Sequence, residues 1–362
     1  MDDQEKAEAG ERLDLAALAV WIDAHDLPGR GEPIEAHFIS GGASNEIYAL
    51  SRGDSAMVLR KPPRRVPKGR NETMLREHRV LAALADSDVP HPRALAVCDD
   101  TAVLGSCFYL MEHVDGWSPM QTEGHWPAPF DADLGARRGL AFELVDGIAR
   151  LGQVDWRKAG LEGFGKPEGF LERQVDRWLH HLGGFKFRAL PGLEEAAEWL
   201  RGHTPKAFRP GILHGDYQFA NVMFRHAAPA RLAAIVDWEM ATIGDPLLDL
   251  AWVLMSWPDP EERGEDAVMT YVDYAGMPSR AELAAHYAEL SGLPVDALDY
   301  YVVLARFKMA CVLEGGYARY VKGAADNPKM QAFGEVVLDM ARRAADLAAR
   351  SPLATSSQSS PR

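Results

Sequence analysis

The spacing of hydrophobic residues changes along this chain and divides it into two parts. Residues 37–50 (HFISGGASNEIYAL) predict a strand, a Gly-Gly turn and a second strand, and residues 55–60 (SAMVLR) predict a third. Residues 72–84 carry apolar side chains at the spacing of an amphipathic helix, and residues 94–99 and 106–113 predict two more strands. The order β-β-β-α-β-β predicts a small antiparallel sheet with one helix.

From residue 136 onward the apolar spacing is helical. It predicts helices at residues 140–151, 170–182, 193–201, 245–255, 280–290, 297–321 and 329–350. The same spacing near Leu13–Trp21 predicts an opening helix before the first strand. A β-hairpin is expected at residues 221–224 and 232–236. The predicted fold class is therefore α+β. Its parts are a tail and helix at 1–34, a small lobe at 35–113, a larger, mostly helical lobe at 114–350 and a disordered tail at 351–362.

Composition narrows the range of partners. The 362 residues carry a formal net charge of -14, so the surface repels nucleic acid and anionic membranes unless the basic residues cluster. They cluster only in residues 60–70 (RKPPRRVPKGR). This stretch is either a solvated loop or the rim of a site for a polyanion such as a nucleotide or coenzyme A.

The cysteines and the N-terminus predict a cytoplasmic location. Cys98, Cys107 and Cys311 show no metal-binding spacing and are expected to be buried thiols. The first residues (MDDQEKAEAGER) are acidic and polar, whereas a signal peptide is basic and then apolar. No apolar run approaches the roughly 20 residues that cross a bilayer.

The most informative segment is residues 212–224 (ILHGDYQFANVMF), which is followed by Asp237 in AAIVDWE. The segment reproduces the spacing of a kinase catalytic loop and its metal-binding aspartate. Asn221 follows Asp216 by five residues, and Asp237 comes after the next apolar strand. Asp216 would orient or accept the proton of an acceptor hydroxyl. Asn221 and Asp237 would bind Mg²⁺.

Several neighbouring polar residues have expected supporting roles. Glu239 is a candidate ligand for a second metal ion, and His214 is expected to hydrogen-bond the loop rather than act as a base. Asp249 begins an apolar helix, where a buried carboxylate would accept backbone N–H bonds from the catalytic loop; Asp245 is expected in a turn or helix cap. The competing interpretation is that each of these residues is only a turn or cap residue.

The chain resembles the aminoglycoside phosphotransferase family, a branch of the kinase-like fold that also includes choline, fructosamine and methylthioribose kinases. The resemblance covers residues 35–345. It is closest to the subgroup that includes kinase-like domains fused to acyl-CoA dehydrogenases. The motifs are GGASNEIYAL, AMVLRKPP, REHRVLAAL, FYLMEHVDG, LHGDYQFANVMF, VDWEMATIGDPLLDLAW, RQVDRW and EGGYARY.

The resemblance implies a bilobal protein-kinase-like fold, ATP and Mg²⁺ as cofactors, and a set of nucleotide-binding residues. Gly42, Ser44 and Asn45 would belong to the loop over the phosphates. Glu77 would pair with the phosphate-binding base, and the backbone of Glu112 and Val114 would meet adenine. The chain departs from the family where the phosphate-binding lysine aligns with Arg60. Lys61 should point to the opposite face of the strand, so Arg60 is the favoured candidate.

The acceptor is not specified by these motifs, nor are the preference for ATP over GTP and the oligomeric state. A small-molecule hydroxyl is the expected acceptor. An aminoglycoside would need a cleft lined by carboxylates, while a hydroxyacyl-CoA would need basic residues and apolar walls. Five acidic residues could line such a carboxylate cleft or belong to a solvated loop: Glu261, Glu262, Glu265, Asp266 and Asp273. A catalytically silent, nucleotide-binding pseudokinase is the alternative from another class.

Overall fold

The structure is a computed structural model that describes residues 13–41, 45–122, 125–262, 271–324 and 328–353. The chain forms two compact units. Unit 1 comprises residues 1–118, 154–164 and 221–241, and unit 2 comprises residues 119–153, 165–220 and 242–362. The predicted disordered ends were residues 1–12 and 351–362, of which 1–12 and 354–362 lie outside the described residues. Ser351 is described: it is buried, and its hydroxyl donates to Asp299 at 2.8 Å.

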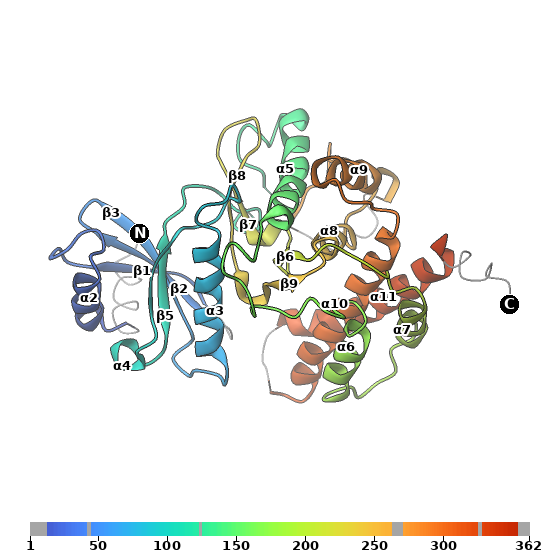
Figure 1. Cartoon of the computed structure of the whole chain (residues 1–362), viewed down its shortest axis with the longest axis horizontal. Coiled ribbons are helices and arrows are strands. Elements are labelled where there is room, and N and C mark those ends of the chain that lie inside the picture. The colour runs from blue at the N-terminus through green and yellow to red at the C-terminus, as the bar shows by residue number, and fades with distance from the viewer. Residues whose placement is uncertain (1–12, 42–44, 123–124, 263–270, 325–327, 354–362) are drawn as a thin grey trace. The chain divides into compact units, whose positions relative to one another are not determined.

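Unit 1 is built on a five-stranded antiparallel sheet in the order β1-β2-β3-β5-β4 (Figure 1). The strands are β1 (Glu35–Gly41), β2 (Glu46–Arg52), β3 (Ser55–Lys61), β4 (Ala94–Cys98) and β5 (Phe108–Glu112). Helices α2 (Leu15–Ala24) and α3 (Arg70–Ala83) cover opposite faces of the sheet, and α4 (Thr101–Leu104) joins β4 to β5. A separate hairpin is formed by β7 (Val222–Phe224) and β8 (Leu232–Ile235).

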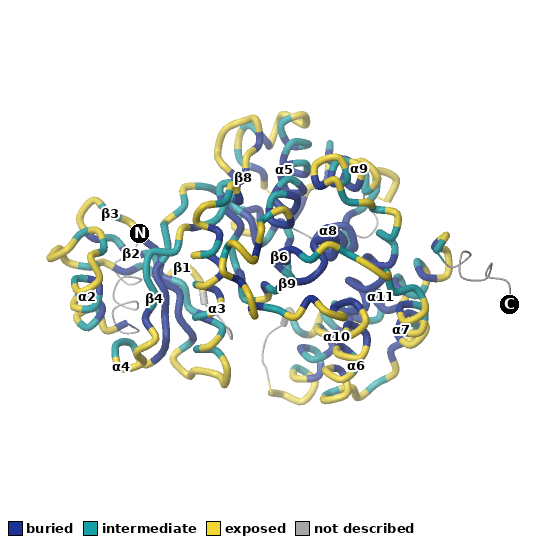
Figure 2. Tube along the Cα trace, in the orientation of Figure 1, coloured by how far each residue is buried: buried dark blue, intermediate teal, exposed yellow. Residues whose placement is uncertain are grey.

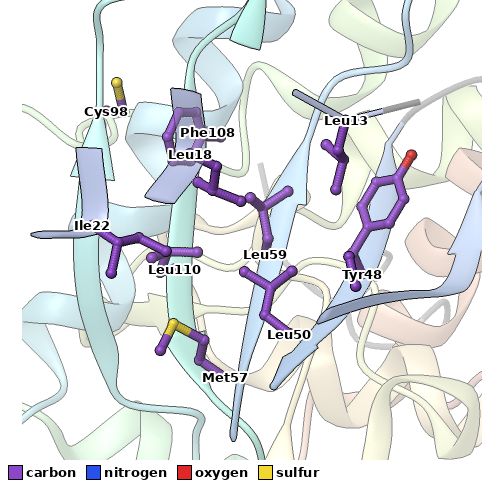
Figure 3. Close-up of a cluster of buried hydrophobic side chains, with 11 residues drawn as sticks. Leu13, Leu18, Ile22, Tyr48, Leu50, Met57, Leu59, Cys98, Phe108 and Leu110 are labelled. Atoms are coloured by element: carbon purple, nitrogen blue, oxygen red, sulfur yellow. The ribbon is translucent and has the colours of Figure 1, made fainter. Parts of the chain in front are cut away.

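The alternation of side chains along β3 and β5 decides what each face of this sheet does. Met57 and Leu59 of β3 and Leu110 of β5 point to the α2 side, where they join a fully buried apolar cluster (Figure 3). The residues between them point the other way because strand side chains alternate. Arg60 and Tyr109, which are direct partners across β3 and β5, therefore contact α3. The face toward α2 is part of the apolar core, and the face toward α3 carries the polar side chains.

Unit 2 is mainly helical. Its helices are α5 (Leu134–Gln153), α6 (Gln174–Gly183), α7 (Leu193–Gly202), α8 (Leu247–Leu254), α9 (Arg280–Ser291), α10 (Leu298–Val321) and α11 (Pro328–Arg350). All residues of α8 are buried, which places this helix in the core of the unit (Figure 2). A short antiparallel pair, β6 (Gly211–Leu213) and β9 (Thr242–Gly244), leads into and out of the segment that carries the catalytic motif.

The predicted bilobal kinase-like fold class, with its sheet order and helical second half, is confirmed. Two details differ. The helix expected from residue 170 begins at Gln174, because Gly169 has a φ of 59° and residues 170–173 form turns. The strands β6 and β9 and the helix α4 were not predicted. Among the described residues, no helix has the length and apolar character needed to cross a membrane.

Candidate active site

The catalytic-loop motif of unit 2 is anchored by one buried carboxylate. The loop follows β6, and Gly215 takes a φ of 84°, a backbone conformation that favours glycine. Asp249, in the first turn of α8 and only 1% exposed, accepts the His214 N–H at 2.7 Å and the Gly215 N–H at 2.9 Å, one with each carboxylate oxygen. The predicted role of Asp249 in holding the loop is thus confirmed.

Asp245 and His214 make the remaining local bonds. Asp245 accepts the Leu247 N–H at 3.1 Å and the hydroxyl of Tyr301 at 2.5 Å, so it closes the turn that precedes α8, as predicted. The backbone N–H of Asp216 donates to Nδ1 of the buried His214 at 3.4 Å. This bond agrees with the predicted loop-stabilising role of His214.

Asp216 itself is half-buried and held by two side-chain donors. Its Oδ1 accepts Nε1–H of Trp252 at 2.9 Å and Nε2–H of Gln218 at 2.8 Å. Gln218 is held in turn by the hydroxyl of Tyr271 at 3.2 Å. Burial and the charge of Asp216 raise the pKa of Tyr271 to about 12, so that hydroxyl keeps its proton at neutral pH. Two donors on one oxygen restrict the orientation of the carboxylate.

Unit 1 carries a second polar cluster, centred on Arg60. Nε of Arg60 lies 2.8 Å from Oε2 of Glu77 in α3, and Nη2 lies 2.6 Å from Oδ1 of Asp237. The hydroxyl of Tyr109 donates to the same Glu77 oxygen at 2.9 Å. Arg60 and Glu77 are buried, whereas the Asp237 side chain is 39% exposed. One guanidinium therefore joins a buried carboxylate to an accessible one.

The charges in this cluster are strongly coupled. Burial opposes the charge of Arg60, but Tyr109, Glu77 and Asp237 together raise its pKa, so it stays protonated. Burial raises the pKa of Glu77 to about 7, with Arg60 and the Tyr109 hydroxyl acting in the opposite direction. The arrangement supplies a permanent positive charge beside Asp237.

Lys61 points away from this cluster. Its Nζ lies 3.2 Å from Glu46, its cross-strand partner in β2, and donates to the carbonyl of Pro62 at 2.9 Å. The two adjacent bases of β3 thus serve different faces of the sheet.

The residues predicted to bind Mg²⁺ lie at the open end of the β7–β8 hairpin. The Val236 N–H donates to the carbonyl of Asn221 at 2.9 Å, which brings Asn221 beside the residue that precedes Asp237. Asp237 has a φ of 66°, which is strained for a residue with a Cβ and typical of functional positions. Glu239, in the 3-10 helix Trp238–Met240, is bound by Arg70 at 2.8 Å and by Asn45 at 3.4 Å.

This donor set fits Mg²⁺. Asn221 and Asp237 offer oxygen atoms, the ligands that Mg²⁺ prefers, and Mg²⁺ is usually held by one or two protein carboxylates together with substrate phosphates and water. Within the ranges that the structure describes, no three His, Cys, Asp or Glu side chains gather into a site that would hold a metal alone.

The other predicted nucleotide-binding residues are only partly visible. Gly42 and Ser44 lie outside the described residues, while Asn45 is buried and contacts Glu239. Glu112 ends β5, and its N–H donates to the carbonyl of Arg93 at 2.9 Å. Val114 follows as a half-buried residue of the connecting segment.

Sequence reasoning missed the residues that hold these groups in place. Trp252 and Gln218, which bind Asp216, received no role. Arg70, which binds Glu239, was considered only as part of the basic segment 60–70. Trp252 lies in the same apolar segment as Asp249, three residues later, so one helical turn separates them. That spacing was the available signal.

The chain was compared with known proteins. The phosphotransferase enzyme family matches residues 35–288. Acyl-CoA dehydrogenase family member 11 of Gallus gallus is 31% identical over 86% of this chain, which spans only 40% of that relative's length. The structure of a candidate aminoglycoside phosphotransferase from Ralstonia eutropha is 30% identical, with a TM-score of 0.79 over 94% of this chain and 99% of that one.

A more distant structure shares the fold alone. The aminoglycoside phosphotransferase APH(4)-Ia, in complex with ADP and hygromycin B, has a TM-score of 0.56 at 13% identity over 92% of this chain and 97% of that one. The family match, the relatives and the kinase-like architecture agree, and we conclude that this chain belongs to the phosphotransferase enzyme family of the aminoglycoside phosphotransferase type.

Proposed function

We propose that the chain transfers the γ-phosphoryl group of ATP to a hydroxyl group of a small molecule, with Mg²⁺ as the metal. The observation that carries the proposal is the geometry around Asp216. Its carboxylate is oriented by Trp252 and Gln218 on a loop that Asp249 fixes. Such a carboxylate can orient an acceptor hydroxyl and take its proton as the oxygen attacks phosphorus.

The Arg60 cluster of unit 1 supports the nucleotide side of the reaction. The guanidinium, kept charged by two carboxylates, is suited to the phosphate oxygens of ATP. Asp237 and Asn221 would hold Mg²⁺, which neutralises charge on the phosphates when bound. Glu77 and Tyr109 keep Arg60 oriented.

The test is phosphoryl transfer from ATP with Mg²⁺ across aminoglycosides, choline-like alcohols, sugars and hydroxyacyl-CoA thioesters, with the products identified by mass spectrometry. Asp216→Asn should lower kcat by roughly 100- to 10,000-fold, the usual contribution of a general base. Asp176→Asn is the matched control, because Asp176 is an exposed carboxylate of the same unit paired with Arg201. ATP binding without transfer to any acceptor would favour the pseudokinase instead.

A hydroxyacyl-CoA is the second candidate acceptor, and the charge distribution favours it over a polycationic aminoglycoside. Of the acidic residues considered for a cationic cleft, Glu262 is paired with Arg280 and Asp273 with Arg137, both at 2.6 Å, while Glu261 is exposed. Glu265 and Asp266 lie outside the described residues. The basic side chains of Arg64, Arg65 and Lys68 are exposed. The relatives in the acyl-CoA dehydrogenase family are consistent with this choice.

Neutralising the exposed basic residues tests this choice. Arg64→Gln combined with Arg65→Gln should raise KM for a hydroxyacyl-CoA but not for the matching hydroxyacyl-pantetheine, which lacks the nucleotide phosphates. A rise in KM for ATP alone would assign the loop to the nucleotide. No change in either KM would leave the loop a solvated surface. The cytoplasmic location and the expected lack of nucleic-acid and membrane partners stay predictions from the sequence.

A further inference from the structure

Lys308 is a buried lysine outside the catalytic loop and the Arg60 cluster. It lies in the middle of α10 and is only 6% exposed. Burying an ammonium group costs free energy unless nearby groups compensate for the lost water. The groups that compensate at Lys308 indicate what it does.

The Lys308 ammonium contacts two groups that adjoin Asp216, a backbone carbonyl of the catalytic loop and the Trp252 indole. Its Nζ donates to the carbonyl of Gly215, the residue before Asp216, at 2.7 Å. It also lies 4.2 Å from the centre of the Trp252 ring, within the range of a cation–π contact. The N–H of that same indole donates to Asp216. One charge therefore acts on the catalytic carboxylate through the backbone and through a side chain.

We propose that Lys308 is a positioning residue for Asp216: its ammonium group holds the Gly215 carbonyl and the Trp252 indole in the arrangement that orients the carboxylate. A cation over the indole face draws electron density from the ring, which makes the N–H a stronger donor to Asp216. The effect on rate rests on the proposed phosphotransferase function, whereas the contacts do not.

Burial of Lys308, together with the charged groups around it, makes this arrangement sensitive to pH. They come from the elements packed against it: Asp216 from the catalytic loop, Asp249 from α8 and Arg177 from α6. Burial lowers the pKa of Lys308 to about 8, with Asp216 and Asp249 acting in the opposite direction and Arg177 adding to the decrease. Deprotonation removes the cation–π contact and weakens the bond to Gly215. The ordering of Asp216 should therefore be lost as the pH rises through about 8.

The first experiment observes the contact directly and needs no activity. The indole ¹⁵N–¹H resonance of Trp252, identified by its loss in Trp252→Phe, is followed from pH 6 to pH 10. In the wild type it should shift with a midpoint near pH 8, and in Lys308→Met it should not. Lys322→Met, an exposed lysine just after α10, is the matched control and should keep the wild-type titration. A resonance without a midpoint in the wild type, or with the same midpoint in Lys308→Met, would overturn the proposal.

The second experiment separates positioning from a merely structural role. Lys308→Met should lower kcat by about 10- to 100-fold, leave KM for ATP nearly unchanged and abolish the alkaline decline of kcat. Lys308→Arg, whose charge persists at high pH, should recover part of the rate and move the decline to higher pH. An alkaline decline that persists in Lys308→Met, or a change confined to KM, argues against positioning.

The two experiments also distinguish a failure of the Lys308 proposal from a failure of the proposed function. A wild-type protein that titrates as expected but transfers no phosphoryl group would refute the proposed function and leave the contact of Lys308 intact. If Lys308→Met does not fold, as judged by circular dichroism, the wild-type titration and Lys308→Arg decide the question.

Discussion

Replacing Asp249 by Asn should loosen the catalytic loop without changing the shape of the side chain. Both carboxylate oxygens accept backbone N–H groups, from His214 and Gly215, at a site that is 1% exposed. Asparagine offers one acceptor oxygen and one NH₂ donor. One backbone N–H would therefore lose its acceptor and face another donor, and burial allows no water to replace the bond.

The size of the effect follows from these contacts. A hydrogen bond to a charged group contributes about 1.5–3 kcal/mol, and a buried donor left without a partner costs about 1–3 kcal/mol. Burial raises the pKa of Asp249, so its carboxylate is poorly solvated and removing the charge recovers part of this loss. We expect a net loss of about 2 kcal/mol, which corresponds to roughly 30-fold in a local opening equilibrium.

Asp245→Asn is the matched control. Asp245 is also buried, and burial raises its pKa too, so neutralising it relieves a similar desolvation cost. Its two partners differ, however: the Leu247 N–H needs an acceptor, but the Tyr301 hydroxyl can rotate and accept a bond from the new NH₂ group. Asparagine at position 245 therefore satisfies both partners, and the expected cost is below about 1 kcal/mol.

Hydrogen–deuterium exchange of a peptide that spans residues 212–217 measures the local opening. In Asp249→Asn the amides of His214 and Gly215 should exchange roughly 30-fold faster than in the wild type, and in Asp245→Asn by less than about fivefold. Equal protection in the two variants would refute the claim that the charged pair of acceptors holds the loop.

Three further predictions test other parts of the structure. Arg60→Met should weaken binding of Mg²⁺–ATP by about tenfold or more, since a charge-assisted contact is lost, while Lys61→Met should change the affinity less than about twofold. Isothermal titration calorimetry compares the two variants, and the reverse ranking would contradict the assignment of Arg60. The folded pKa of Lys308, about 8, lies below its ordinary value of 10.5, so the unfolded chain binds more protons between these values and stability rises with pH there. Urea unfolding should show the wild type gaining about 3 kcal/mol relative to Lys308→Met from pH 8 to above pH 10, and parallel curves would exclude the titration. Gly244→Ala should lower the stability by about 1–3 kcal/mol, because the new Cβ would lie 2.6 Å from the Phe170 ring. Gly183→Ala in α6, whose new Cβ would have no such neighbour within 4 Å, should raise the stability by about 0.5–1 kcal/mol. Thermal unfolding that ranks the two variants otherwise would show that the packing at Gly244 relaxes.

Much of the fold was predictable because its elements have local signals. The strands of the five-stranded sheet alternate or run apolar between turn residues, and the long helices repeat apolar residues at helical spacing. The strands β6 and β9 have three residues each and exist only because they pair with each other across about thirty residues of chain. Such pairs leave no periodic pattern to detect.

The residues of the candidate site also differ in how well the sequence predicts them. Asp216, Asn221 and Asp237 stand at informative spacings, and Asp249 was assigned from its place at the start of an apolar helix. Lys308 offered no comparable signal, because a lysine in a long helix is usually exposed. Arg70 had a similar ambiguity within a basic segment, and only the structure pairs it with Glu239. Residues that hold a site together come from distant parts of the sequence, so spacing alone cannot find them.

The Arg60 cluster and the neighbouring Arg70–Glu239 pair have a consequence for how the binding of Mg²⁺ and of ATP are coupled. Three acidic side chains, Glu77, Asp237 and Glu239, share two guanidinium groups, those of Arg60 and Arg70. A nucleotide without metal would add negative charge to a region where carboxylates already outnumber bases, while Mg²⁺ alone would compete with Arg60 for Asp237. Each ligand therefore removes an electrostatic obstacle to the other. We expect positive cooperativity between Mg²⁺ and ATP, and by thermodynamic reciprocity each should raise the affinity of the other by the same factor.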